Sequence, residues 1–362
     1  MFDLTGQPVF VLSVALAVAL PVLIGILWSR RRASTSGGPP FALVVAGRIG
    51  VILLAQLLAM TSIFLYVNNQ YGFYSSWSDL FGLSGDAPPP IQVDAGPGAG
   101  TGTSKGAGSV EVMTVHSTSG VTADTLVWLP PGYKASGKTK YPVVMFLPGQ
   151  PSQPQHLYTE YDFANVASQA ITSGKVKPFV AVFPPIMIAP PRDTECVDVP
   201  NGPQAETWLT TDVPNALQAK YRVEPLGKQW SLLGWSTGAL CVAKLLLKHP
   251  TSFAAAVSFG GQFDTYLDNT TGDLFGGNTQ LQNENSPMWL YSQYGMRGGK
   301  LLMIAGKQDI WAGKATDQMA AATHGDPNVT LITFPTGGHN YHNYKAYLAP
   351  ALEWLAKSGA AG

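Results

Sequence analysis

The sequence predicts an α/β fold, in which helices flank a mostly parallel central sheet, preceded by two transmembrane helices. Three observations predict this organisation. Two long apolar segments stand within residues 1–67, a Gly- and Pro-rich stretch follows them, and residues 110–362 alternate between apolar strands and segments of helical spacing. Parallel strands need crossover connections, usually helices, so this alternation indicates a sheet that is buried between layers of helices.

The composition narrows the class of protein. The chain has 22 basic and 22 acidic residues, so its formal net charge is zero. Proteins that bind nucleic acid usually carry an excess of basic residues, which this chain lacks, so we expect no nucleic-acid partner. Only 12% of the residues are charged and 46% are hydrophobic, which favours a chain that lies partly in a membrane.

Two N-terminal segments account for this hydrophobicity. Residues 8–28 and 41–67 are each long enough to span a bilayer. Three arginines at residues 30–32 stand between them, and the positive-inside rule places this basic loop in the cytoplasm. A cleaved signal peptide is the alternative for the first segment, but no basic residue precedes it and a second span follows. The sequence predicts a two-span anchor in the plasma membrane, with the rest of the chain on the extracytoplasmic face.

The sequence predicts that the chain has three parts. Residues 1–67 form the anchor. Residues 68–109 begin with aromatic side chains typical of a membrane interface and continue as a linker rich in Gly and Pro. Residues 110–362 are long enough to form one large α/β domain.

Hydrophobic periodicity predicts the elements of that outer domain. We expect strands at 110–117, 122–129, 141–147, 179–183, 230–235, 253–259, 300–305 and 329–334. We expect helices at 162–172, 207–221, 314–323 and 341–357, and one directly after residue 236. Residues 262–299 are long and irregular and hold several aromatic side chains, so we expect this insertion to form a substrate pocket.

The functional prediction depends on the sequence Gly234-Trp235-Ser236-Thr237-Gly238. An apolar strand precedes it and a helical pattern follows, so Ser236 stands at a sharp strand-to-helix turn with its hydroxyl exposed. The glycines on both sides avoid the crowding that a Cβ would cause. A glycine-rich turn with a bystander serine is the alternative. We take Ser236 as the candidate nucleophile.

A serine hydroxyl becomes a good nucleophile only when a base takes its proton, and an acid must orient that base. His339 is the candidate base, because it lies in a Gly-Gly-His-Asn loop directly after a predicted strand. Asp309 is the candidate acid, because it ends the loop after the preceding strand. His342 and Asp264 are the alternatives, and Asp309 has capping of the next helix as an alternative role.

The negative charge that develops on the substrate oxygen needs two backbone N–H donors. Thr237 supplies the first, because it follows the nucleophile directly. The second should come from the loop after the strand 141–147. Two prolines in that loop have no N–H, so Gln150 is the preferred donor and Gly149 the second choice.

Together these residues resemble the α/β-hydrolase superfamily. The outer domain is similar to the esterase D group, whose relatives include feruloyl-esterase-like enzymes and the antigen 85 mycolyltransferases. The resemblance is carried by Val-Trp-Leu-Pro-Pro-Gly-Tyr at residues 127–133, by the turn at Ser236, by the strand that leads to Asp309 and by the loop of His339. It covers residues 110–357 and implies an α/β-hydrolase fold and an acyl-enzyme mechanism.

Two features depart from that resemblance. Residues 148–151 read Pro-Gly-Gln-Pro where the related enzymes have a His-Gly form. The candidate acid is aspartate, whereas the mycolyltransferases use glutamate, which favours hydrolysis over acyl transfer.

Cys196 and Cys241 are the two cysteines of the chain. Outside the membrane, two cysteines can pair. Cys241 lies one turn into the helix after Ser236, and Cys196 lies in a loop after the strand 179–183. We predict a disulfide that pins this loop over the site, with two separate buried thiols as the alternative.

The sequence therefore predicts a membrane-anchored, exported serine esterase that hydrolyses carboxylic (acyl) esters of small molecules or lipids. Acyl transfer to a sugar or lipid hydroxyl is one alternative, and a non-catalytic envelope protein on the same fold is another. We expect no cofactor and no catalytic metal, because the chain has no His-Glu-x-x-His and no paired Cys-x-x-Cys.

Overall fold

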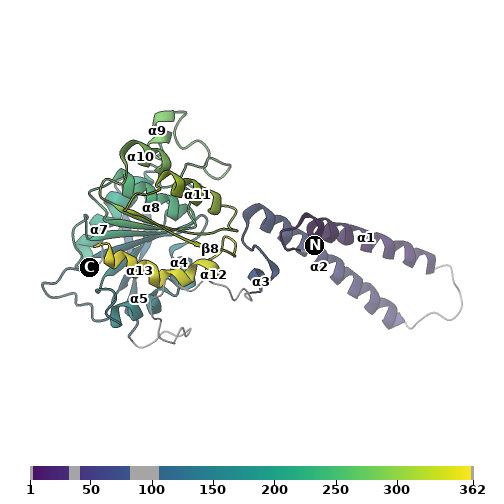
Figure 1. Cartoon of the computed structure of the whole chain (residues 1–362). Coiled ribbons are helices and arrows are strands. Elements are labelled where there is room, and N and C mark those ends of the chain that lie inside the picture. The colour runs from purple at the N-terminus through teal and green to yellow at the C-terminus, as the bar shows by residue number, and fades with distance from the viewer. Residues whose placement is uncertain (1–2, 32–40, 82–105, 360–362) are drawn as a thin grey trace. The chain divides into compact units, whose positions relative to one another are not determined.

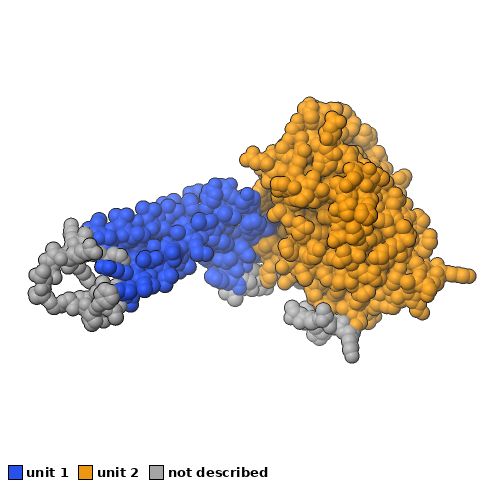
Figure 2. Space-filling model, turned by 180° about the vertical axis from the view of Figure 1, so that it is seen from behind, with its two compact units in different colours: residues 1–85, 337–339 blue, residues 86–336, 340–362 orange. Residues whose placement is uncertain are grey.

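The computed structural model of the chain describes residues 3–31, 41–81 and 106–359. It divides into two compact units (Figure 2). Unit 1 contains residues 1–85 and Gly337–His339, and unit 2 contains residues 86–336 and 340–362. Most of the predicted linker and part of the predicted basic loop lie outside the described residues.

Unit 1 is built on two long helices, α1 (Gln7–Arg31) and α2 (Phe41–Tyr71), followed by the short α3 (Trp77–Leu80). Both long helices contain a segment that is long and apolar enough to cross a bilayer. Gln7–Ile26 has a mean hydropathy of 2.8, and Val45–Tyr71 has 2.1. The second helix continues to Tyr71, beyond the predicted end at residue 67, because no helix-breaking residue intervenes.

Unit 2 contains an eight-stranded sheet in the order β1-β2-β4-β3-β5-β6-β7-β8. Its strands are β1 (Ser109–His116), β2 (Thr122–Leu129), β3 (Val143–Leu147), β4 (Val180–Phe183), β5 (Trp230–Trp235), β6 (Ala255–Phe259), β7 (Lys300–Gly306) and β8 (Val329–Phe334). The first two strands pair antiparallel, β2 pairs antiparallel with β4, and all other neighbours are parallel. The predicted mostly parallel sheet is confirmed.

Helices cover both faces of this sheet (Figure 1). The side chains of β3 alternate between two hydrophobic cores, with Val143, Met145 and Leu147 in one and Val144 and Phe146 in the other. Over the first core lie α7 (Val213–Lys220), α8 (Thr237–Lys248), α10 (Pro287–Tyr294) and α11 (Gly313–Ala322). Over the second lie α4 (Pro154–Glu160), α5 (Phe163–Thr172) and α13 (Leu348–Lys357).

Two predicted helices are interrupted. The helix expected at 207–221 consists of α6 (Ala205–Thr207), a π-helical turn (Trp208–Asp212) and α7. The helix expected at 341–357 consists of α12 (Tyr341–Tyr344), a 3₁₀ turn (Lys345–Tyr347) and α13. Both breaks immediately precede a helix with proline in its first turn, Pro214 or Pro350, which cannot donate the i→i−4 hydrogen bond that would continue the helix before it.

The sequence analysis expected an irregular insertion at residues 262–299, but part of this insertion is helical. It contains α9 (Thr279–Asn283) and α10. The side chain of Ser286 caps α10 by accepting a hydrogen bond from the N–H of Trp289, and Pro287 occupies the first turn. These are standard helix-start signals, so this helix was predictable from the sequence.

Candidate active site

Ser236 lies at the turn between β5 and α8, in a strained backbone conformation. Its φ is 56° and its ψ is −119°, a region that residues with a Cβ rarely adopt. The N–H of Ser236 donates to the carbonyl oxygen of Phe259 at 3.0 Å, which ties the turn to the end of β6. This is the backbone geometry of a nucleophile elbow, which holds a serine hydroxyl clear of its own helix.

Three glycines make this turn sterically feasible. A Cβ on Gly234 would lie 2.1 Å from the carbonyl oxygen of Gly238. A Cβ on Gly238 would lie 2.2 Å from the carbonyl oxygen of Leu147, and one on Gly149 would lie 2.7 Å from the Cβ of Ser236. The end of β3 therefore packs directly against the turn, and Gln150 follows immediately after the glycine that touches Ser236.

Asp309 follows β7 and is held by several hydrogen bonds. The residue is 2% exposed. Oδ1 accepts the N–H groups of Trp311 and Ala312, both at 2.9 Å, and Oδ2 accepts the hydroxyl of Tyr344 at 2.6 Å. Burial and the charge of Asp309 raise the pKa of Tyr344, so the phenol stays a donor. Asp264, the alternative acid, lies on the surface.

His339 follows β8 and belongs to unit 1. It is 9% exposed, and its N–H donates to the carbonyl oxygen of Gly72 at 2.8 Å. In the same unit, the N–H of Gly338 donates to Oδ2 of Asp79 at 3.0 Å. The side chain of Asp79 is also buried and accepts the N–H of Ser75 at 2.8 Å. Residues 72–79 thus fix the backbone beside His339.

The alternative base, His342, lies exposed in α12. The three candidate residues Ser236, Asp309 and His339 each follow the carboxyl end of a parallel strand, β5, β7 and β8. Ligands of open α/β sheets bind at this edge.

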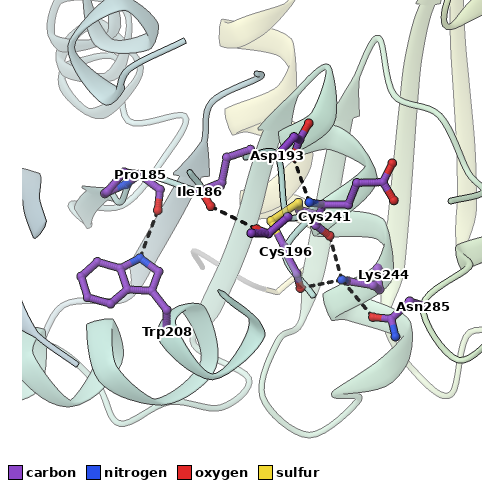
Figure 3. Close-up of a disulfide and its surroundings, with 10 residues drawn as sticks. Pro185, Ile186, Asp193, Cys196, Trp208, Cys241, Lys244 and Asn285 are labelled. Atoms are coloured by element: carbon purple, nitrogen blue, oxygen red, sulfur yellow. Dashed lines mark hydrogen bonds between the residues drawn. A yellow bond between two sulfur atoms is a disulfide. The ribbon is translucent and has the colours of Figure 1, made fainter. Parts of the chain in front are cut away.

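The predicted disulfide is present and joins Cys196 to Cys241 (Figure 3). It connects the loop after β4 to the middle of α8. Among the residues that the structure describes, no group of three or more His, Cys, Asp or Glu side chains could hold a metal ion.

Sequence reasoning missed three polar residues near these sites: Tyr344, Asp79 and Lys244. Each one makes a contact with a part of the chain that is distant in sequence, and Asp79 and Gly338, for example, are 259 positions apart. No local pattern signals such a contact. A lysine at an apolar-patterned position of a helix was the only available hint, and it marks Lys244 as unusual.

The chain belongs to the esterase family, because the family model described as "Putative esterase" matches residues 120–355. A relative from Corynebacterium glutamicum, an uncharacterized protein, is 27% identical over 264 residues, which are 68% of this chain and 60% of the relative. The chain therefore spans less than two thirds of the length of that relative.

Solved structures show the same fold at low identity. A ferulic acid esterase matches with a TM-score of 0.61 and 18% identity, over 69% of this chain and 98% of the esterase. An S-formylglutathione hydrolase from Agrobacterium tumefaciens matches with a TM-score of 0.59 and 19% identity, over 72% of this chain and 98% of the hydrolase. A fluorophosphonate-binding serine hydrolase of Staphylococcus aureus gives a TM-score of 0.57 and 17% identity, over 69% and 98%. The predicted esterase-type α/β-hydrolase fold is confirmed.

Proposed function

We propose that this chain is a serine esterase that cleaves carboxylic esters through an acyl-enzyme. The hydroxyl oxygen of Ser236 attacks the ester carbonyl, and His339 takes its proton and passes it to the leaving alcohol. Asp309 orients the imidazole and stabilises its charged form. Water then attacks the acyl-enzyme, with His339 as base, and releases the acid.

The strained backbone of Ser236 is the observation that carries this proposal. A non-glycine residue at φ 56° costs conformational energy. In a chain of the esterase family, we attribute this cost to the placement of a serine hydroxyl at the carboxyl edge of the sheet. The N–H groups of Thr237 and Gln150 are the proposed donors to the oxyanion. The contact of Gly149 with Ser236 supports the second donor, because it brings this loop against the nucleophile.

Burial supports Asp309 and His339 over their alternatives. A triad acid is buried and hydrogen bonded, so that its charge acts on the imidazole rather than on water. Asp309 meets this description, whereas Asp264 and His342 are solvent-exposed.

The full-length chain in detergent tests the proposal through hydrolysis of p-nitrophenyl esters and labelling by a fluorophosphonate probe. We expect Ser236→Ala to abolish labelling and to lower kcat by at least about 10³-fold, as nucleophile removal does in other serine hydrolases. Asp309→Asn and His339→Ala should cost about 10²- to 10⁴-fold. Asp264→Asn and His342→Ala are the matched controls and should retain activity. Labelling that survives Ser236→Ala would contradict the proposal.

The same assay separates hydrolysis from acyl transfer, since both reactions share the acyl-enzyme. With a lipid ester as donor, we expect free acid as the product even when trehalose or glycerol is added. An acylated sugar or glycerol as the main product would contradict hydrolysis and would show that the chain is an acyltransferase.

We also propose that the chain is anchored in the plasma membrane by α1 and α2 with unit 2 outside the cell. The two apolar helices support anchoring, and the disulfide supports an oxidising compartment. Protease added to intact spheroplasts should degrade unit 2 and leave a cytoplasmic marker intact. Protection of unit 2 until the membrane is permeabilised would contradict this orientation.

A further inference from the structure

The end of α2 is hydrogen bonded to the segment that follows it, residues 72–79. The N–H of Gly72 donates to the carbonyl oxygen of Asn68 at 2.7 Å. Asn68 is buried, and its side chain makes two hydrogen bonds with the main chain of Tyr74. Its Nδ2 donates to the carbonyl oxygen of Tyr74 at 2.9 Å, and its Oδ1 accepts the N–H of Tyr74 at 2.8 Å. These bonds hold the segment against the last turn of the helix, so its position follows that of α2.

The loop of the proposed base is attached to the same segment, and all these contacts lie within unit 1. The N–H of His339 donates to the carbonyl oxygen of Gly72, which is the first residue after α2. A Cβ on Gly338 would lie 2.5 Å from the carbonyl oxygen of Gly72 and 2.7 Å from that of Phe73. The main chain of His339 is therefore in direct contact with the end of α2.

The length of the apolar helix sets the level of this contact in a bilayer. The segment Val45–Tyr71 has 27 residues, which is about 40 Å of helix. The hydrocarbon core of a bilayer is about 30 Å thick, and about 40–45 Å with the headgroup layers. An α2 that spans the membrane, as proposed, therefore ends in the headgroup layer. Gly72 and the main chain of His339 lie at the same level.

The side chains around this contact suit the headgroup layer. Tyr71, Phe73 and Trp77 are exposed. The rings of Tyr71 and Phe73 stack with their centroids 5.6 Å apart, and Trp77 stacks on Phe81 at 6.4 Å. Tyrosine and tryptophan concentrate at the membrane–water interface, because each combines an apolar ring with a polar group. The exposed rings thus support the level that the helix length indicates.

We propose that the ester bond is cleaved at the surface of the membrane that holds α2, and that the substrates are lipid esters of that membrane. This inference rests on the proposed function, because it takes His339 as the base and α2 as a membrane span. A general base acts only within hydrogen-bond reach of the proton it takes, so the ester bond lies close to the imidazole. Diacyl lipids carry their ester bonds between headgroup and acyl chains, at this level of the bilayer. The reaction consumes water and releases a fatty acid and an alcohol.

The test reconstitutes the full-length chain in phosphatidylcholine vesicles and offers two fluorogenic resorufin esters. One carries two ether-linked lauryl chains that hold it in a bilayer, and the other is the water-soluble resorufin acetate. The lipid ester is placed either in the vesicles that hold the chain or in separate vesicles. We expect it to be cleaved at least about tenfold faster in shared vesicles, because the common surface raises its effective concentration.

Resorufin acetate separates a failure of this inference from a failure of the proposed function. Cleavage of the acetate, with no cleavage of the lipid ester or with equal rates from shared and separate vesicles, would overturn the lipid substrate alone. Cleavage of neither ester, or cleavage that survives Ser236→Ala, would contradict the proposed esterase itself.

The level of the base loop can be measured without substrate. An environment-sensitive fluorophore is attached to Ser78→Cys, at an exposed position of α3, or to His342→Cys. His342 follows His339 by three residues, so the chain keeps the two within about 11 Å. We expect vesicles with spin-labelled lipid headgroups to quench both fluorophores to a similar extent. Quenching at Ser78→Cys alone would overturn the placement of the base at the membrane, and quenching at neither position would also contradict the anchoring.

Discussion

Close approach of backbone atoms determines the shape of the turn that carries Ser236. The strand β3 ends against this turn, and the position of Gly149 leaves no room for a side chain next to Ser236. A shift of about 1 Å in a reacting group can cost about 10²-fold in rate. The reactivity of Ser236 should therefore depend on a residue that has no functional group.

Gly149→Ala tests this dependence. Its Cβ would lie 2.7 Å from the Cβ of Ser236 and 3.1 Å from Cδ1 of Trp235, so the turn must shift. We expect kcat to fall by about 10²-fold, with the fold retained, since only a local displacement is needed. Gly227→Ala is the control, because its Cβ would make only ordinary contacts at 3.8 and 3.9 Å. Equal activities of the two variants would show that the turn tolerates the shift.

At the scale of elements, the segment that follows α2 does more than the sequence analysis expected. Aromatic side chains in this region predicted a membrane-interface belt, and that prediction stays untested. Within unit 1, the same segment hydrogen bonds to the backbone of Gly338 and His339. The Cβ of any residue in place of Gly338 would lie 2.5 Å from the carbonyl oxygen of Gly72, so the two backbones are in contact.

Asp79→Ala tests whether this contact matters for the proposed base. The variant leaves the N–H groups of Gly338 and Ser75 without their carboxylate acceptor. Loss of a charged acceptor costs about 1.5–3 kcal/mol. We expect a looser loop at His339, seen as a fall of kcat of about tenfold or more and as slower fluorophosphonate labelling. Ser78→Ala, an exposed neighbour, should behave like the wild type, and identical labelling rates for all three proteins would refute the role of Asp79.

The elements themselves were largely predictable, and the reasons are physical. The parallel strands β3 to β6 are buried at every position, so they read as continuous apolar runs. All eight strands of the sheet were located to within about two residues. The turn at Ser236 was predictable because Gly234 and Gly238, which the turn requires, lie within two residues of Ser236 in the sequence. The breaks before Pro214 and Pro350 were missed, although proline gave the signal. Tyr344, Lys244 and Asp79 were missed because their contacts form only when distant segments fold together.

At the scale of the whole molecule, a buried carboxylate in unit 2 joins two helices that are distant in sequence. Glu206 in α6 accepts hydrogen bonds from Lys248 and His249 at the end of α8, both at 2.8 Å. Burial alone would raise the pKa of Glu206. The hydrogen bond from His249 and the charges of Lys244 and Lys248 outweigh burial and lower that pKa to about 2.

This shift predicts how stability depends on pH. The pKa of Glu206 is lower in the folded state than its ordinary value of 4.5, so the folded state favours the ionised form. The stabilisation is complete above about pH 4.5 and is lost as the pH falls toward 2, by on the order of 3 kcal/mol. Thermal unfolding between pH 7 and pH 2.5 should show this loss in the wild type and a smaller one in Glu206→Gln. Glu160→Gln, at an exposed carboxylate, is the control, and parallel pH profiles for all three chains would contradict the assignment.

The sulfur–sulfur bond between Cys196 and Cys241 bears on when the protein matures. Thiols remain reduced in the cytosol of most cells, and the bond forms only where oxidants prevail. If the chain is exported as we propose, the loop of residues 192–196 is held to α8 in the newly synthesised chain by the hydrogen bonds of Lys244 but not by the disulfide. The anchoring of this loop to α8 would then be completed only after delivery to the oxidising compartment.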